Sequence, residues 1–140
     1  MTNALDRAFA NLIESLKDLT PSLDQDLLGQ ILRSAAVIEQ TFGGLTSNLW
    51  DDPFEWTLPE TLSTPELVID HLSEVDALRQ RFFNSLAGDE DLIKLVSDPS
   101  GEPRALVELL LETLVRASDY RGRAIGSHKE AQKSQEPRTH

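Results

Sequence analysis

The chain has 140 residues, a formal net charge of −11 and no cysteine. The length suits one domain, and the missing thiols exclude disulfides, thiolate nucleophiles and metal sites held by cysteine. The acidic charge would repel a nucleic-acid backbone. The sequence also has no run of about 18 apolar residues, which a membrane span needs. We therefore expect a cytoplasmic protein that binds neither nucleic acid nor membrane.

Two segments in the first third of the chain carry apolar residues at helical spacing. The first segment, residues 3–19, repeats them at steps of four and three: Leu5, Phe9, Leu12, Leu16 and Leu19. Thr20 and Pro21 suit the N-cap and the first turn of a second helix. Gly43 and Gly44 suit its end, because glycine takes the left-handed conformation of a helix C-cap without strain.

Residues 45–64 contain Pro53 and Pro59, which forbid a continuous helix. A loop of this length in a compact domain is usually functional or held down by its own side chains, so we expect it to lie across the bundle and close one end. We also expect its large aromatic residues to dock a partner protein or a second copy of the chain. These residues are Trp50, Phe54 and Trp56.

A third helix is predicted to begin at Pro65 and to stop before Gly88. Thr64 before Pro65 suits an N-cap followed by proline in the first turn. Ser63 and Glu66 have the spacing of a capping box and offer a competing start. Gly88 then suits the end of the helix.

The last third of the chain is predicted to hold a short helix over residues 89–96, a turn at 98–101 and a long helix from Pro103 to about Ile125. The turn is indicated by its proline and glycine. No convincing pair of strands is found. Residues 127–140 are polar and aperiodic, so we expect a flexible polar tail.

Four amphipathic helices with short or packed connections can bury one shared core. They predict an all-α fold, a four-helix bundle with a long aromatic and proline-containing loop between the second and third helices. We expect residues 1–126 to form this single domain.

Helical positions, at about 100° per residue, place several polar side chains on the apolar faces. Arg79 falls in the stripe of the third helix with His71 at its edge, and Arg121 falls in the stripe of the last helix beside Tyr120. Glu39 lies on the apolar face of the second helix. Buried charges need partners. These candidate ligand-binding residues therefore form either a structural network or a ligand pocket. In the network, the arginines can also reach out to solvent. In a pocket, Arg79 and Arg121 would bind a carboxylate or phosphate.

Other chemistry lacks the necessary residues. Histidine occurs at His71, His128 and His140, and the last two fall in the expected tail, so the folded part cannot supply a metal site of two or three histidines. No calcium loop, phosphate-binding glycine loop or nucleophile elbow is present in the sequence. We therefore assign no catalytic residue, no metal and no cofactor.

A tryptophan-containing loop leads into a predicted helix that carries a histidine. The residues concerned are Trp56, the run Thr64-Pro65-Glu66-Leu67-Val68-Ile69-Asp70-His71-Leu72, and Arg79. The last predicted helix contains Arg116-Ala117-Ser118-Asp119-Tyr120-Arg121-Gly122. These two stretches resemble the DinB/YfiT-like superfamily, and together with the residues between their motifs they cover about half of the chain.

The resemblance implies a four-helix bundle, often dimeric, with a divalent-metal site of three histidines. Of these histidines only His71 is kept, and Arg116 and Tyr120 occupy the positions of the family's paired histidines. The resemblance thus implies a lost metal site, in which Tyr120 and Arg121 would line the former pocket beside His71.

The leading functional hypothesis is a non-catalytic DinB-like bundle that binds a partner protein or a small ligand. One alternative is an enzyme for an anionic small molecule, with His71 as acid or base and with Arg79 and Arg121 as the anion clamp. Another is a metal-dependent DinB-type transferase with a degenerate site. A fourth is a helical interaction module that docks through the aromatic loop.

Overall fold

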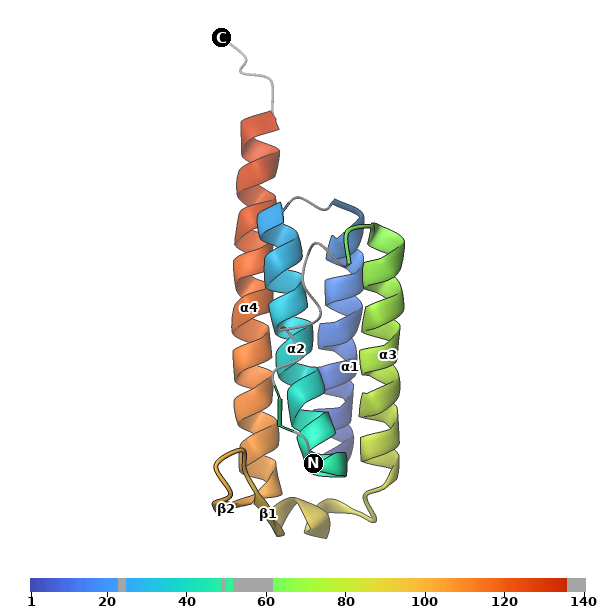
Figure 1. Ribbon diagram of the computed structural model, residues 1–140, viewed down its shortest axis with the longest axis vertical. Helices are drawn as coiled ribbons and strands as arrows, with labels where there is room; N and C mark the ends of the chain where they lie inside the picture. The colour runs from blue at the N-terminus through green and yellow to red at the C-terminus, as the bar shows by residue number, and fades with distance from the viewer. Residues whose placement is uncertain (23–24, 49, 52–61, 136–140) are drawn as a thin grey trace.

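The computed structural model describes residues 1–22, 25–48, 50–51 and 62–135. The helices within these residues are α1 (Thr2–Leu19), α2 (Gln25–Ser47), α3 (Pro65–Asn84) and α4 (Leu106–Gln135). The shorter elements are the 3-10 turns η1 (Thr20–Ser22) and η3 (Asp89–Ile93) and the antiparallel strands β1 (Leu95–Ser97) and β2 (Pro103–Ala105). The prediction of an all-α helical bundle is confirmed (Figure 1).

The long helices form two parallel pairs. α1 and α4 run in one direction, and α2 and α3 run in the other (Figure 1). α2 packs along α3 and α4, and α1 packs along the same two helices, so that α3 and α4 occupy opposite corners of the bundle. Because α2 and α3 are parallel, Ser47 at the end of α2 and Pro65 at the start of α3 lie at opposite ends of the bundle. Among the described helices, none is both long and apolar enough to cross a lipid bilayer.

A phenylalanine cluster fills the core near the end of the bundle at which α2 and α3 finish. The ring centroids of Phe9 and Phe42 are 5.2 Å apart, and those of Phe42 and Phe82 are 5.1 Å apart. Each fully buried side chain of this kind stabilises the fold by about 1.5–3 kcal/mol. Inside the same bundle, the hydroxyl groups of Thr41 and Thr113 lie 2.6 Å apart and join α2 to α4.

The predicted end of α2 at Gly43 and Gly44 is wrong, because the helix continues to Ser47. Gly44 serves close packing instead: a Cβ at this position would lie 2.2 Å from the Trp50 ring. Asn48 takes the left-handed conformation that ends the helix, with a φ of 56° and a hydrogen bond of 2.9 Å from its N–H to the Gly44 carbonyl oxygen. Of the aromatic residues expected in this loop, Phe54 and Trp56 lie outside the described residues.

Thr20 and Pro21 do not begin α2, as the sequence suggested, but form η1 after α1. The Thr20 hydroxyl donates to the Leu16 carbonyl oxygen at 2.8 Å, so it satisfies the end of α1 rather than capping a new helix. The predicted start of α3 is confirmed. Thr64 is the N-cap, and its side-chain oxygen accepts from the Leu67 N–H at 3.2 Å.

The segment between α3 and α4 differs most from the prediction. A helix was expected over residues 89–96 and no strands, but η3 ends at Ile93 and the hairpin of β1 and β2 follows. The predicted turn is present, since the Gly101 N–H donates to the Asp98 carbonyl oxygen at 2.9 Å and Gly101 has a φ of 86°. Strands of this length are too short to show an alternating pattern in the sequence.

The bounds of α4 also differ from the prediction. Pro103 pairs in β2, so α4 begins at Leu106. The helix continues past Ile125 to Gln135, because no proline interrupts the chain before residue 137. The expected tail, residues 127–140, is therefore helical as far as Gln135.

Candidate functional site

Arg79 is buried as predicted, and its charge is matched within the bundle. Its side chain is 10% exposed. Its Nη1 donates to Asp6 on α1, and its Nε donates to Asp76 on α3 at 2.8 Å. Two carboxylates neutralise the guanidinium, so Arg79 is a brace between α1 and α3 and has no free charge to offer a ligand.

Glu39 and His71 meet at the contact of α2 with α3. His71 Nε2 lies 3.5 Å from Glu39 Oε2, and His71 Nδ1 lies 3.9 Å from the Glu74 carboxylate. Burial lowers the pKa of His71, against the attraction of Glu74 for the charged ring. Burial also raises the pKa of Glu39, and repulsion by Glu74 raises it further. Both groups are thereby shifted toward their uncharged forms.

This pair places a carboxyl group beside an imidazole, just beyond hydrogen-bond distance. Glu39 Oε2 and His71 Nε2 are buried atoms with no hydrogen-bond partner among the described residues. The ring of His71 is nevertheless only 8% exposed. A substrate would have to displace neighbouring groups before the ring could exchange a proton with it.

Arg121 has a different environment from Arg79. Its Nε donates to the Ser15 hydroxyl of α1 at 2.5 Å. None of the described carboxylates lies within ion-pair distance of its guanidinium. Arg121 lines an open groove of about 280 Å³ between α1 and α4, which we call the Arg121 groove. The groove is lined by Ala8, Asn11, Leu12, Leu114, Ser118 and Arg121.

The predicted site residues are therefore only partly brought together. Glu39 and His71 face each other, but Arg79 is held at the contact of α1 with α3 and Arg121 at the contact of α1 with α4. Tyr120 is half-buried, and its ring stacks under the guanidinium of Arg123 at 5.2 Å. Because α3 and α4 occupy opposite corners, the structure does not assemble His71 and both arginines into one anion clamp.

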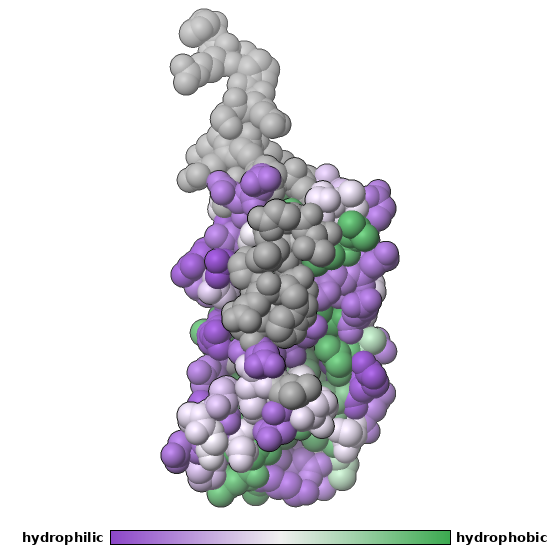
Figure 2. Space-filling model, viewed as in Figure 1, coloured by the Kyte–Doolittle hydropathy of each residue, from purple (hydrophilic) through white to green (hydrophobic). Residues whose placement is uncertain are grey.

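A second hollow lies at the end of the bundle where the hairpin joins α3 and α4. We call it the basal recess. It has a volume of about 270 Å³, and its walls are mostly apolar. The walls are Leu45, Phe82, Ser85, Leu86, Asp91, Lys94, Val96 and Leu106. The segment that supplies Lys94 and Val96 to this wall also carries Ile93, which is 75% exposed, and Leu95, which is 70% exposed, although neither of these two lines the recess itself. Apolar surface at this end of the molecule is visible in Figure 2.

The charged wall of the basal recess is internally paired. Lys94 Nζ lies 2.5 Å from Asp91 Oδ1, and the Ala87 N–H donates to Asp91 Oδ2 at 2.6 Å. The hydrogen bonds from Lys94 and from Ala87 lower the pKa of Asp91 below its ordinary value. The recess thus offers apolar contacts, with an ion pair at its mouth.

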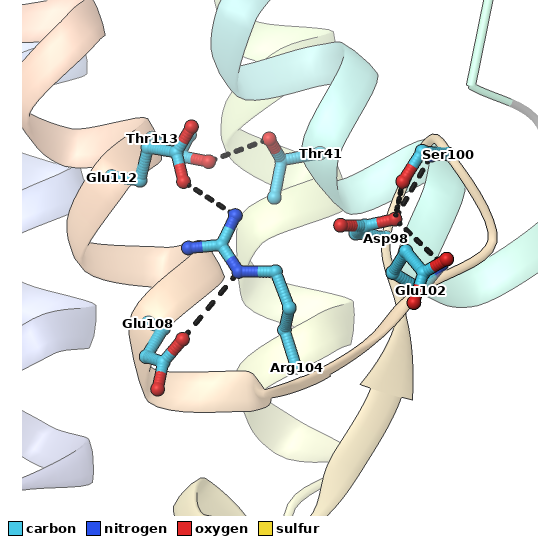
Figure 3. A network of polar contacts seen from close by, with 8 residues as sticks. All are labelled: Thr41, Asp98, Ser100, Glu102, Arg104, Glu108, Glu112 and Thr113. Carbon is cyan, nitrogen blue, oxygen red and sulfur yellow. Dashed lines mark hydrogen bonds and ion pairs between the residues drawn. The ribbon is translucent and has the colours of Figure 1, made fainter.

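Polar contacts hold the hairpin in place (Figure 3). Asp98 Oδ1 accepts from the Ser100 N–H at 2.9 Å and from the Glu102 N–H at 2.9 Å. Arg104 on β2 donates to Glu112 on α4 at 2.7 Å and to Glu108 at 3.5 Å. The hairpin is thereby tied to α4. The basal recess was not predicted from the sequence, and the clearest signal for it is the apolar pair Ile93 and Leu95 within a charged segment.

Within the described residues, no group of three or more histidine, cysteine, aspartate or glutamate side chains is placed to hold a metal ion. The DinB-like resemblance, with the lost metal site that it implies at His71, Arg116 and Tyr120, stays a prediction.

Comparison with known proteins gives one partial similarity and no family. No protein-family model matches the chain, and no solved structure matches it. Protein MON2 of Saccharomyces cerevisiae is 30% identical over 105 residues, which cover 69% of this chain and 6% of that protein. The chain therefore spans a small fraction of the length of this curated relative.

Proposed function

We propose that this chain is a non-catalytic helical module that binds a partner protein, and that the basal recess is the docking site. The observation that carries the proposal is an apolar hollow of about 270 Å³ beside two strongly exposed apolar side chains, Ile93 and Leu95. Single exposed apolar residues are ordinary, but two of them in the short segment that walls an apolar hollow support an interaction site at this end of the bundle.

The surrounding charge defines the chemistry of the partner. The chain carries a net charge of −11, and Glu90 in η3 is exposed with no ion-pair partner among the described residues. A segment with one large apolar side chain for the recess and flanking lysine or arginine residues would match this surface.

The edge of β1 supports an extended conformation for that segment. The Leu106 N–H donates to the Lys94 carbonyl oxygen, and the Asp98 N–H donates to the Glu102 carbonyl oxygen, each at 2.9 Å. In an antiparallel ladder, hydrogen-bonded pairs alternate with pairs that are not hydrogen-bonded to each other. Leu95 and Ser97 belong to the second kind, so their backbone N–H and C=O groups point away from β2. No described residue hydrogen-bonds these groups, so they suit the addition of one more strand, as in β-strand addition.

The similarity to Protein MON2 supports a modular role, because the matching stretch is a small part of a much longer protein. The alternative of an anion-processing enzyme has less support, since His71, Arg79 and Arg121 belong to different contacts of the bundle. A DinB-type transferase has less support for a related reason: only His71 remains of the implied ligands.

Selection from a library of random peptides, with the intact chain as bait, tests this function. We expect enriched peptides to combine an aromatic or aliphatic residue with lysine or arginine. Leu95→Glu should weaken their binding by at least about tenfold, the effect of losing an important interface contact. Val115→Glu is the matched control, because Val115 is 69% exposed on α4 and gains the same charge.

Three outcomes would contradict the proposal. The library could yield no enriched peptide, or Leu95→Glu could leave binding unchanged, or Val115→Glu could weaken binding equally. Light scattering of the free chain separates a partner from a second copy. A dimer that dissociates in the Leu95→Glu variant would show that the recess binds another copy of this chain instead.

A further inference from the structure

The two arginines that point into the bundle differ in what balances their charge. Arg79 is balanced by Asp6 and Asp76. Arg121 is half-buried, and its polar contact among the described residues is the neutral Ser15 hydroxyl at 2.5 Å. A partly desolvated guanidinium without a carboxylate attracts an anion strongly, because fewer water molecules screen its charge.

The contact with Ser15 also fixes the direction of the guanidinium. The Nε–H is used by the serine hydroxyl, which leaves the pair of terminal nitrogens without a hydrogen-bond partner among the described residues. Two parallel N–H groups at the end of a guanidinium match the two oxygens of a carboxylate. The fork is thus oriented before any ligand arrives, which reduces the entropy cost of binding.

The Arg121 groove has room for an apolar body attached to such an anion. Its volume of about 280 Å³ is just below the usual range for ligand pockets, about 300–1,000 Å³, which suits a small ligand. Leu12 and Leu114 form its apolar walls, while Asn11 and Ser118 supply further hydrogen-bonding groups. A small molecule that carries an apolar group and one acidic group would be complementary to these walls.

We propose that the Arg121 groove is a binding site for a small monocarboxylate with an apolar body. A single cation balances a single negative charge. A dianionic phosphate would leave a surplus negative charge next to a protein whose net charge is −11. This site lies between α1 and α4, and it is independent of the basal recess.

Benzoate, phenyl phosphate and neutral benzamide are suitable probes, titrated into the 15N-labelled intact chain and followed by amide chemical shifts. We expect benzoate to shift amides of residues 8–15 and 114–122 with a Kd of about 1 mM, as for other ligands of this size. Benzamide should bind at least about tenfold more weakly, since it lacks the charge.

Variants of the groove distinguish specific binding from general attraction to a cation. Arg121→Gln removes the fork and should weaken benzoate binding at least about tenfold. Arg123→Gln makes the same charge change on the exposed face of α4, where Arg123 pairs with Asp119 at 3.0 Å, and should change the Kd less than about twofold. Ala8→Leu fills the groove without changing charge, and should also abolish binding.

The proposal is overturned by any of three results. Benzoate could cause no shifts in the groove, or it could bind equally to the Arg121→Gln variant with its helical circular dichroism intact. Tighter binding of phenyl phosphate than of benzoate would also overturn it, because it would assign the groove to phosphate. Loss of binding in the Ala8→Leu variant, which keeps Arg121, separates the effect of the groove from any effect of Arg121 on folding.

Discussion

The Gly44→Ala substitution tests the packing of Trp50 on α2. In a helix interior, alanine is more stable than glycine by about 1 kcal/mol. At Gly44, however, an added Cβ would lie 2.2 Å from the nearest carbon atoms of the Trp50 ring. The ring has to move, and such overpacking costs about 1–3 kcal/mol. The two effects together predict that Gly44→Ala lowers the free energy of unfolding by up to about 2 kcal/mol.

Gly29→Ala is the matched control on the same helix. A Cβ at Gly29 would meet no heavy atom within 4 Å, so this substitution should raise the free energy of unfolding by about 0.5–1 kcal/mol. In a Trp50→Ala background the obstructing ring is gone, and Gly44→Ala should then stabilise by about 1 kcal/mol. Urea unfolding followed by far-ultraviolet circular dichroism measures all of these values. Equal stabilisation by Gly29→Ala and Gly44→Ala in the wild-type background would refute the reasoning.

Three further substitutions test other contacts by urea unfolding. Arg79→Met leaves two carboxylates unpaired and should lower the free energy of unfolding by about 1–3 kcal/mol, which is less than for a fully buried pair because both carboxylates are partly exposed. Arg81→Met, at an exposed position, should change it by less than about 0.5 kcal/mol. Equal effects of the two substitutions would contradict the role of Arg79 as a brace between α1 and α3. The folded-state pKa of His71 is lowered from 6.5, so below pH 6.5 the unfolded chain binds the proton first and stability is lost as the pH falls. His71→Phe should therefore gain stability relative to wild type between pH 7 and pH 5.5, and a flat or opposite difference would show that the shift has the other sign. Gly101→Ala should lower the free energy of unfolding by about 1 kcal/mol, because Gly101 has a φ of 86°. Gly122→Ala, with open space around the added Cβ, should raise it by up to about 1 kcal/mol. Stabilisation by both substitutions would contradict the turn geometry.

The helices were predictable because each buries one face, and the spacing of Leu5, Phe9 and Leu12 on α1 shows that face directly. The end of α2 was not predictable from Gly43 and Gly44. A glycine permits a left-handed cap and also permits close packing, and only the position of Trp50 distinguishes the two. The hairpin was missed because β1 and β2 pair through so few residues that local pattern carries no signal.

The burial of Arg79 was predictable from its position on α3, but its partners were not. Helical spacing shows which face of a helix is buried, and it does not show which helices are neighbours. The parallel run of α2 and α3 places Glu39 beside His71, while α1 brings Asp6 to Arg79 and Ser15 to Arg121. The candidate site was therefore separated into three places by the order in which the helices pack.

The most direct test of the proposed function is to locate a selected peptide on the molecule. The tightest peptide from the library would be titrated into the 15N-labelled intact chain. We predict that the largest amide shifts fall on residues that line or flank the basal recess, such as Leu45, Leu86, Leu95 and Val96, and that they disappear in the Leu95→Glu variant. Shifts concentrated elsewhere on the bundle, or unchanged by Leu95→Glu, would contradict the assignment of the recess as the docking site.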